Sequence, residues 1–248
     1  MRKSRIIFLP ALLACSLLIA PIAARATTNF GLQFDSNGHQ LNFCDNNVAF
    51  TGCTPLGLDG DPTLGVIAFS GSVGNWTIDK GNGFGPPFEV LPLLLDLSSF
   101  NAETTNGHGA NALTILLSVT NLTGPLGVFN FVNAAGGTSS LGTTVYTSQA
   151  FLSTSNTVFC GSGCGTPITN QLLLSGLNFS GSQSGTGATG AGPYAVTLQI
   201  TIDANGPDQT SFDSQLTQNS IPEPATLSVL GAGLLALGTG LRRKLAGA

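Results

Sequence analysis

Short apolar runs separated by turn residues constrain the fold of this chain more than any other feature. About ten such runs lie between Gly, Asn, Asp and Pro clusters, and no amphipathic helix of useful length occurs before Pro222. We expect strands at NFGLQF (29–34), TLGVIAFSG (63–71), NWTID (75–79), FEVLPLLLDL (88–97), ALTILLSVTNL (112–122), VFNFV (128–132), TTVYTSQAFL (143–152), NQLLLSGLNFSG (170–181), YAVTLQITID (194–203) and TSFDSQL (210–216). Many short strands without intervening helices predict an all-β body, built as an antiparallel β-sandwich.

The run YAVTLQITID shows the strand pattern most clearly. From Val196 to Ile202 every second residue is Val, Leu or Ile, and the residues between them are Thr or Gln. Such alternation predicts a half-buried strand whose apolar face lies in the core. By contrast, GSQSGTGATGAGP (181–193) is a Gly, Ser and Thr stretch of low complexity, which we expect to form a flexible loop between two strands.

The N-terminus has the organisation of a secretory signal peptide. Cations between Arg2 and Arg5 precede an apolar run over 6–22, and Ala24-Arg25-Ala26 has the small-x-small form that signal peptidase accepts. We therefore expect signal peptidase to remove residues 1–26 by cleaving after Ala26, so that the body is exported.

Two other interpretations of the N-terminus remain open. One is an uncleaved signal anchor, although such anchors usually contain nearer ~20 apolar residues. The other is a lipoprotein signal, because Leu12-Leu13-Ala14-Cys15 loosely resembles a lipobox. The apolar run continues well past Cys15, which a lipoprotein cut there would not need.

The C-terminus contains a second apolar segment. Ala225–Leu241 holds no charged residue, and as a helix it would be roughly 26 Å long. That length nearly matches a hydrocarbon core of ~30 Å, so we predict a transmembrane helix over 225–241. Arg242, Arg243 and Lys244 follow directly, and by the positive-inside rule they would stay in the cytoplasm while the body lies outside. A buried core helix is the alternative, but it fits poorly beside three adjacent cations.

Pro222, Glu223 and Pro224 immediately precede this segment, and the two prolines hold the chain extended as a protease substrate strand is held. The order Pro-Glu-Pro, Leu/Gly-rich span and basic cluster resembles the PEP-CTERM sorting signal, with Ile221 in place of the more usual Val and Lys244 in place of a third Arg. The resemblance implies a Gram-negative envelope protein that an exosortase cleaves near the Pro-Glu-Pro. It also implies delivery to the cell surface or the exopolysaccharide matrix.

The charge of the body excludes one large class of function. Lys80 is the only Lys or Arg between Thr27 and Ile221, whereas eleven acids lie there, so the net formal charge is −10. Nucleic-acid binding needs clustered cations to neutralise phosphates, and we expect no nucleic-acid partner. Direct contact with anionic lipid or acidic polysaccharide is disfavoured for the same reason. We therefore expect membrane contact only through the C-terminal helix.

Four cysteines remain after the signal peptide, namely Cys44, Cys53, Cys160 and Cys164. An even number in an exported chain favours disulfides. Three connectivities exist, and we prefer the two local pairs, Cys44–Cys53 and Cys160–Cys164, because short loops close easily. The rival is a Cys₄ metal site, but the spacing is not usual for zinc, so we expect no metal there.

The sequence lacks two common catalytic motifs. His39 and His108 both lie in glycine-containing turns, and neither a Gly-x-Ser-x-Gly elbow nor an HExxH pair occurs. Three carboxylate pairs could in principle serve glycoside hydrolysis: Asp59 with Asp61, Glu89 with Asp96, and Asp35 with Asp203. Solvated turn acids explain them better, so we expect no catalytic residues and keep a secreted hydrolase as the least favoured alternative.

Ligand-binding candidates are few. Trp76 and Tyr194 would stack on sugar rings if the body were a carbohydrate-binding module. DSNG (35–38), DGD (59–61) and DANGPD (203–208) place side-chain oxygens around Gly as calcium loops do. Asp/Asn-Gly is also the strongest hairpin-turn signal. We therefore expect no cofactor, with calcium as an alternative that would bridge the acidic surface to an acidic polysaccharide.

The sequence thus predicts a signal peptide (1–26), an extracytoplasmic β-sandwich domain (27–220) and a sorting signal (221–248). The expected function is that of an exported, non-catalytic protein, anchored transiently in the inner membrane and then released to the surface or matrix. There it would be a structural or adhesive component of exopolysaccharide or biofilm. The alternative is a secreted carbohydrate-binding module, assisted by calcium, with extracellular polysaccharide as the partner.

Overall fold

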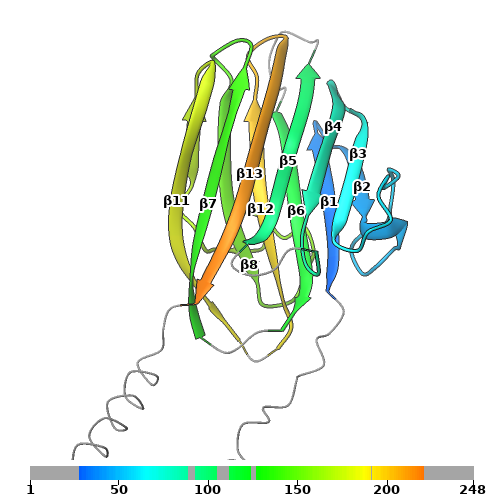
Figure 1. Cartoon of the computed structure of the whole chain (residues 1–248), viewed down its shortest axis with the longest axis vertical. Coiled ribbons are helices and arrows are strands. Elements are labelled where there is room, and N and C mark those ends of the chain that lie inside the picture. Colours follow the sequence, from blue (N-terminus) through cyan, green and yellow to red (C-terminus); the bar gives the residue numbers. More distant parts are fainter. Residues whose placement is uncertain (1–27, 89–92, 105–111, 124–126, 191, 221–248) are drawn as a thin grey trace, which may run out of the picture.

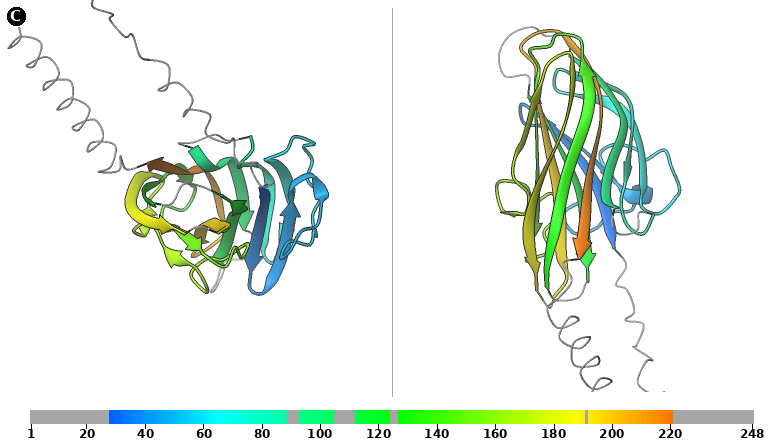
Figure 2. Two further views of the ribbon diagram at one scale, coloured as in Figure 1. Left: turned by 90° about the horizontal axis from the view of Figure 1, so that it is seen from below. Right: turned by 60° about the vertical axis from the view of Figure 1, so that its left-hand side comes forward.

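Two antiparallel sheets stack face to face and form the body of the protein (Figure 1). The structure is a computed structural model and describes residues 28–88, 93–104, 112–123, 127–190 and 192–220. The seven-stranded sheet has the order β10-β8-β12-β6-β1-β2, with β9 paired to β8, and the six-stranded sheet has the order β11-β7-β13-β5-β4-β3. The left view of Figure 2, from below, shows the two sheets as two facing layers.

The strands and the one short helix are β1 (Asn29–Ser36), β2 (His39–Cys44), η1 (Asp45–Asn47), β3 (Val66–Val73), β4 (Trp76–Phe84), β5 (Leu93–Thr104), β6 (Ala112–Leu122), β7 (Gly127–Ser139), β8 (Val145–Ser153), β9 (Thr166–Pro167), β10 (Leu172–Ser175), β11 (Asn178–Thr189), β12 (Tyr194–Asp203) and β13 (Asp208–Ser220). The predicted all-β, antiparallel sandwich is confirmed. β6 and β12 cover the predicted residues from end to end.

The core-facing side of β12 matches the predicted alternation. Val196, Leu198 and Ile200 are fully buried, and Ile202 is almost so. The opposite side of this strand is covered over its first half, where Thr197 is buried and its hydroxyl lies 2.9 Å from the Ser118 hydroxyl on β6, whereas Gln199 and Thr201 are half-buried. The strand is therefore more buried than the half-buried strand predicted from its sequence.

The prediction of a flexible loop over 181–193 is wrong. β11 runs through Thr189 and pairs residue by residue with β7. Its glycines are required by close approach of another segment, since a Cβ on Gly185 would lie 2.5 Å from the Ile168 carbonyl oxygen. The predicted run 170–181 also divides, because the chain turns at Gly176 and places β10 and β11 in different sheets.

Five phenylalanines from both sheets dominate one half of the core. Phe34, Phe43, Phe69, Phe100 and Phe212 form a chain of ring contacts with centroid separations of 4.7 to 6.2 Å. Tilted and edge-on ring pairs of this kind contribute about 0.5 to 1.5 kcal/mol each beyond the burial of their area. The phenylalanines therefore hold the two sheets together.

A small polar layer crosses the other half of the core. Asn133 on β7 exchanges hydrogen bonds with Ser148 on β8, at 2.9 and 3.2 Å. The Tyr146 hydroxyl donates to the Ser214 hydroxyl at 2.9 Å, and burial raises the pKa of Tyr146 far above its usual value. Because buried polar groups are costly when they lack a partner, these bonds favour one register of the sheets over its neighbours.

Both predicted local disulfides, Cys44–Cys53 and Cys160–Cys164, are present. Their loops lie against the outer face of the seven-stranded sheet. A Cβ placed on Gly31 would come within 2.9 Å of the Phe159 ring, and one on Gly52 within 2.5 Å of Val158. The loops therefore cover the part of this face around Gly31.

The first and last strands begin and end at the same end of the sandwich, which we call the base (Figure 1). The predicted signal peptide and cleavage site at Ala24 and Ala26, the sorting signal, the basic residues 242–244, Glu89 and His108 lie outside the described residues. Within the part of the chain that the structure describes, no helix is long and apolar enough to cross a membrane.

Candidate functional site

The outer face of the six-stranded sheet is open to solvent, and β13 shows how the sequence creates it. Phe212, Ser214 and Leu216 are buried against the core, whereas Asp213 and Gln215 point outward and are exposed. This period-two alternation follows from the pleat of the strand. It lines the outer face with amide, hydroxyl and carboxylate groups.

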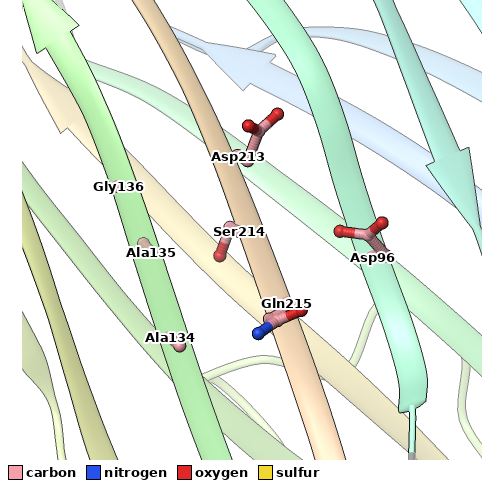
Figure 3. Close-up of a pocket in the computed structure, with 7 residues that line it drawn as sticks. All are labelled: Asp96, Ala134, Ala135, Gly136, Asp213, Ser214 and Gln215. Carbon is pink, nitrogen blue, oxygen red and sulfur yellow. The ribbon is translucent and has the colours of Figure 1, made fainter.

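A shallow hollow of about 240 Å³ lies on this face over β5, β7 and β13. We call it the groove. Its lining residues are Asp96, Ala134, Ala135, Gly136, Asp213, Ser214 and Gln215 (Figure 3).

Small residues form the floor of the groove and polar residues its walls. Ala134 on β7 lies opposite Gln215 on β13 and opposite Ser182 on β11. Gly136 likewise lies opposite Asp213. Because directly opposed residues share one face of a sheet, the missing side-chain volume on β7 leaves a trough between two rows of hydrogen-bonding groups.

A β-bulge shapes the wall formed by β5. The register between β13 and β5 shifts between Phe212 and Ser214, and Ser99 has a positive φ of 54°. The Ser99 N–H donates to the Asp213 carboxylate at 2.6 Å, which stabilises this uncommon conformation. Bulges of this kind re-aim side chains, and this one lies at the rim of the groove.

A stacked pair of aromatic rings, the half-buried Phe84 and the exposed Phe88, borders the groove on its other side. Phe84 on β4 lies opposite Asp96, and the Phe84 and Phe88 rings stack with a centroid separation of 5.4 Å. Phe84 points outward because its neighbours Gly83 and Gly85 face Phe30 in the core. Phe88 is 51% exposed, so one ring face is available to a ligand.

The groove is acidic. Asp96 and Asp213 belong to its lining, whereas the only Lys or Arg in the body sequence, Lys80, lies on β4 opposite Asn101. Such a surface suits a neutral ligand with many hydroxyl groups and repels polyanions.

The prediction that Trp76 and Tyr194 stack on sugar rings is wrong. Trp76 is fully buried and Tyr194 is 5% exposed, and both belong to the hydrophobic core. Burial also raises the pKa of Tyr194, against the opposing effect of a hydrogen bond with Gln218. Neither ring has a face available to a ligand.

The acids of the 59–61 turn serve the structure of the 45–65 segment. The Asp59 carboxylate accepts hydrogen bonds from the N–H groups of Asn46, Asp61 and Ala68 at 2.9 to 3.0 Å. Burial raises the pKa of Asp45, and the neighbouring carboxylates of Asp59 and Asp61 add to the effect. In the described residues no three His, Cys, Asp or Glu side chains are grouped so that they could hold a metal ion.

Asp208, in the third predicted calcium loop, is also occupied by protein donors. Its buried carboxylate accepts hydrogen bonds from the hydroxyls of Ser139, Ser140 and Thr144 and from the N–H of Leu141. Burial alone would raise the pKa of Asp208, but these bonds outweigh it and hold the pKa below its usual value. The side chain fastens the 139–144 connection to β13.

The three predicted carboxylate pairs lie at different places on the sandwich. Asp35 accepts hydrogen bonds from Gly38 N–H and Gln40 within its own hairpin, and His39 is exposed in that turn. Asp203 lies on the same sheet and near the same end as Asp35, because Asp35 pairs with Thr114 and Asp203 with Ala112 on β6, the strand that separates them. Asp96 lies in the groove on the six-stranded sheet, and its predicted partner Glu89 lies outside the described residues.

Sequence reasoning missed Phe84 and Phe88 as outward-facing aromatic residues. Phenylalanine is usually a core residue, and only Trp and Tyr were considered as platforms. The signal that could have found them is the run GNGFGPPF (81–88), in which glycines alternate with Phe84. Inward glycines free an aromatic residue to face outward.

Comparisons with solved structures find only loose likenesses. An enzymatically active domain of the bacteriophage CBA120 tailspike protein 4 aligns at 13% identity and a TM-score of 0.30, over 58% of this chain and 19% of that one. TmCBM61, solved with β-1,4-galactotriose, aligns at 10% identity and a TM-score of 0.27, over 62% of this chain and 88% of that one. A carbohydrate-binding module of the β-sandwich superfamily aligns at 9% identity and a TM-score of 0.30, over 77% and 85%. The chain spans about a fifth to a third of the first three matched structures.

These likenesses assign no function, and no curated protein sequence matches the chain. The C-terminus is more informative. The family described as "PEP-CTERM protein-sorting motif" matches residues 220–244. This range starts at Ser220, the last residue of β13, so the motif directly follows the folded body. The motif implies export and a membrane-anchored C-terminal sorting signal, and the chain carries this motif at residues 220–244.

Proposed function

We propose that this protein is an exported, non-catalytic adhesion component of the cell surface or extracellular matrix. After exosortase processing of its tail it binds a neutral polysaccharide along the groove. The observation that carries the proposal is the row across the outer face of the six-stranded sheet. In that row the Phe84–Phe88 stack, Asp96, Gln215, Ala134 and Ser182 lie on adjacent strands.

This row has the two elements that recognition of a sugar requires. Phe88 offers an exposed ring face for the apolar side of a pyranose. Asp96, Gln215 and Ser182 offer hydrogen-bonding groups for hydroxyls, and the small floor at Ala134 lets a chain approach the sheet. The open trough suits a stretch of polymer better than a single small molecule.

The charge of the surface selects the kind of polymer. Asp96 and Asp213 repel uronic acids and sulfated sugars, and no basic residue of the body sequence other than Lys80 could compensate. A neutral hexose polymer is therefore the proposed ligand. Calcium-bridged binding of an acidic polymer is the alternative, and a chelator would abolish it.

Non-catalytic action fits the way the acids are used. Asp59 and Asp208 each accept three or more hydrogen bonds from the protein, so neither is poised as a general acid or base. Release of reducing ends from the bound polysaccharide would overturn this part of the proposal.

The groove is tested by filling it. In the full-length chain, purified in mild detergent, Ala134→Phe places a ring on the floor of the trough. We expect affinity for neutral polysaccharide purified from the host's matrix to fall at least tenfold, measured by isothermal titration or affinity electrophoresis. Gln215→Ala and Phe88→Ala should each weaken binding less, by about 1 to 2 kcal/mol, because each removes one contact.

A matched control is available on the same face. Ala188 on β11 is exposed and lies opposite Val128, about 20 Å along the strands from the groove at ~3.4 Å per residue. Ala188→Phe should bind like the wild type. Equal binding by Ala134→Phe and Ala188→Phe would contradict the assignment of the groove.

Processing is tested separately by the intact mass of the protein recovered from the host's outer-surface or matrix fraction. We expect a chain that starts at Thr27 and ends near Pro222-Glu223-Pro224, with two disulfides that reductant opens. Substitution of all three motif residues by Ala should leave the basic residues 242–244 on the protein and keep it in the membrane fraction. Recovery of the tail on wild-type protein in the matrix would contradict exosortase processing.

A further inference from the structure

Charged residues are unevenly distributed over the sandwich. Between Glu103 and Asp203 the sequence holds no Asp, Glu, Lys or Arg, and the strands β6 to β12 belong to this stretch, apart from the last residue of β12. The flank formed by β7, β8, β10 and β11 therefore carries no such residue. Figure 1 shows β11 as the outermost strand of this uncharged flank, with β2 and β3 on the other side of the molecule. Two copies of so acidic a body repel each other least through this flank.

β11 ends the six-stranded sheet with an open edge. In antiparallel strands, the N–H and C=O groups of successive residues point alternately to one side and the other. The Leu177 carbonyl accepts the N–H of Ser139 on β7, whereas the Ser184 carbonyl accepts the N–H of Asn170, which lies outside β7. Even-numbered residues of β11 therefore turn their peptide groups away from β7. Over 178–182, no hydrogen bond from another described residue reaches this outer side of the strand.

The other edge strands are short or covered. Asp59 and Gly60 hydrogen-bond to Ala68 on β3, and the N–H groups of residues 56–57 donate to the Asn42 carbonyl on β2, all at 2.9 to 3.0 Å. β10 has only four residues. Natural sheets protect their edges with covering loops, short strands, charges and prolines. β11 has twelve residues and contains neither a charge nor a proline, so it is the edge best suited to accept another strand.

We propose that the β11 edge is a dimer interface, at which β11 of a second copy adds in antiparallel orientation across a two-fold axis. Such an interface uses one self-complementary surface on both subunits. The open positions Asn178, Ser180 and Ser182 determine the register. Only the register centred on Ser180 pairs all three, because it also sets Asn178 opposite the partner's Ser182. The two six-stranded sheets then merge, and both grooves open on the same face.

Electrostatics favours a second copy at this edge. Counted from the edge, β13 is the first strand of its sheet that carries acids, and it lies two strand spacings away. Across the interface the acids of the two β13 strands are therefore at least five spacings apart, or about 24 Å at ~4.8 Å each. This separation exceeds the Debye length of about 8 Å at physiological ionic strength. Leu177, which directly precedes β11 and is 58% exposed, lies beside the added strand and is shielded from water by it.

Cysteine cross-linking of the full-length chain, purified in mild detergent, tests the register. Directly opposed residues of a hydrogen-bonded antiparallel pair have Cα atoms about 5.5 Å apart, which is within the range of a disulfide. Ser180→Cys should therefore form a disulfide-linked dimer on mild oxidation, well above the level of the wild type.

Ser184→Cys is the matched control, because Ser184 is exposed on the same face of the same strand. In the proposed register it lies opposite the partner's Gly176, roughly 27 Å from the partner's Ser184 at ~3.4 Å per residue. It should cross-link at least tenfold more slowly than Ser180→Cys.

The oligomeric state tests the edge itself. Ser180→Pro removes an edge N–H without losing a hydrogen bond to β7, because that N–H faces away from β7. Ser180→Lys places like charges directly opposite each other at the two-fold axis. Each should raise the dissociation constant of the dimer at least tenfold in sedimentation equilibrium without polysaccharide. Ser72→Lys, at an exposed position on β3, the other edge strand of the same sheet, is the control and should stay within twofold of the wild type.

A wild type that stays monomeric at every concentration reached would overturn the proposal. Equal cross-linking of Ser180→Cys and Ser184→Cys, or equal dissociation constants of Ser180→Lys and Ser72→Lys, would also overturn it. Species larger than dimers would contradict the two-fold axis. The groove variant Ala134→Phe should leave the dissociation constant unchanged, so failure of this inference and failure of polysaccharide binding can be told apart.

Discussion

The outer faces of the two sheets differ sharply, although both consist of alternating antiparallel strands. On the seven-stranded sheet the two disulfide loops cover the outward residues around Gly31, where Phe159 packs. On the six-stranded sheet the outward residues around Ala134 and Gly136 remain open and border the groove.

The difference shows how one architecture separates stability from recognition. Where the loops cover the seven-stranded sheet, outward residues are buried and hydrogen-bonded, as Ser118 and Thr197 are. A sheet with one bare face can present its amides, carboxylates and aromatic rings to a ligand. The predictions below ask whether this division holds, beginning with the largest expected effect.

On the six-stranded sheet, removing an inward aromatic ring should reduce stability, whereas removing an outward ring should reduce polysaccharide binding. Trp76→Ala removes a fully buried side chain and should lower the free energy of unfolding by about 3 to 5 kcal/mol. Phe88→Ala removes an exposed ring and should cost under about 1 kcal/mol while weakening polysaccharide binding. Urea titration combined with the binding assay checks both. Loss of binding without loss of stability in Trp76→Ala would contradict the core assignment.

Asp208 should make stability depend on pH. Because hydrogen bonds hold its pKa below the usual 3.8, the ionised carboxylate stabilises the fold fully above that value. The contribution is lost as the pH falls through the lower pKa of the folded state. At pH 7, Asp208→Asn should lower the free energy of unfolding by about 2 to 3 kcal/mol. The gap between variant and wild type should narrow on acidification in urea titrations from pH 7 to pH 3, and a constant gap would contradict this role.

Opening the cover of the seven-stranded sheet should affect stability but not binding. Cys160→Ser with Cys164→Ser removes one disulfide, and for so short a loop the chain-entropy model gives a loss of about 2 kcal/mol. The affinity for polysaccharide should stay within twofold of wild type, because the groove lies on the other sheet. A larger loss of affinity would show that the two faces are not independent.

The smallest expected effect is the difference in stability between two Gly→Ala variants, one on the open face and one on the covered face. A Cβ on Gly136 would meet its nearest neighbour at 3.5 Å, an ordinary contact, whereas one on Gly31 would press on the Phe159 ring at 2.9 Å. Gly136→Ala should leave stability unchanged or raise it by up to about 1 kcal/mol. Gly31→Ala should lower it by about 1 kcal/mol. Thermal unfolding of the two variants side by side checks the difference, and the reverse order would contradict the packing of Phe159.

The sequence predicts some elements well and others poorly, for reasons that individual residues make clear. β12 alternates Val, Leu and Ile with polar residues, so its core face is predictable from period alone. β11 is not, because its inward positions include Gly181, Gly185 and Gly187, whose role depends on segments far away in the chain. The disulfides are predictable because both join near neighbours.

The candidate site is the least predictable part. Trp76 and Phe88 both precede or follow turns, and nothing local distinguishes the ring that is buried from the ring that is exposed. Burial depends on tertiary packing. Trp76 faces the core between the two sheets, whereas Phe88 stacks on the outward-facing Phe84. The groove itself depends on the registers that bring Ala134, Gln215 and Asp96 side by side.

The central claim is that the open face of the six-stranded sheet is the ligand-binding surface. Its most direct test is an NMR titration of the isotope-labelled full-length chain, in detergent, with neutral matrix polysaccharide. We predict saturable shifts of the backbone amides of Ala134 and Gly136 and of the Gln215 side-chain amide, while Gly31 and Gln199 on the covered face stay unchanged. Shifts confined to the covered face, or no saturable shift at all, would contradict the account.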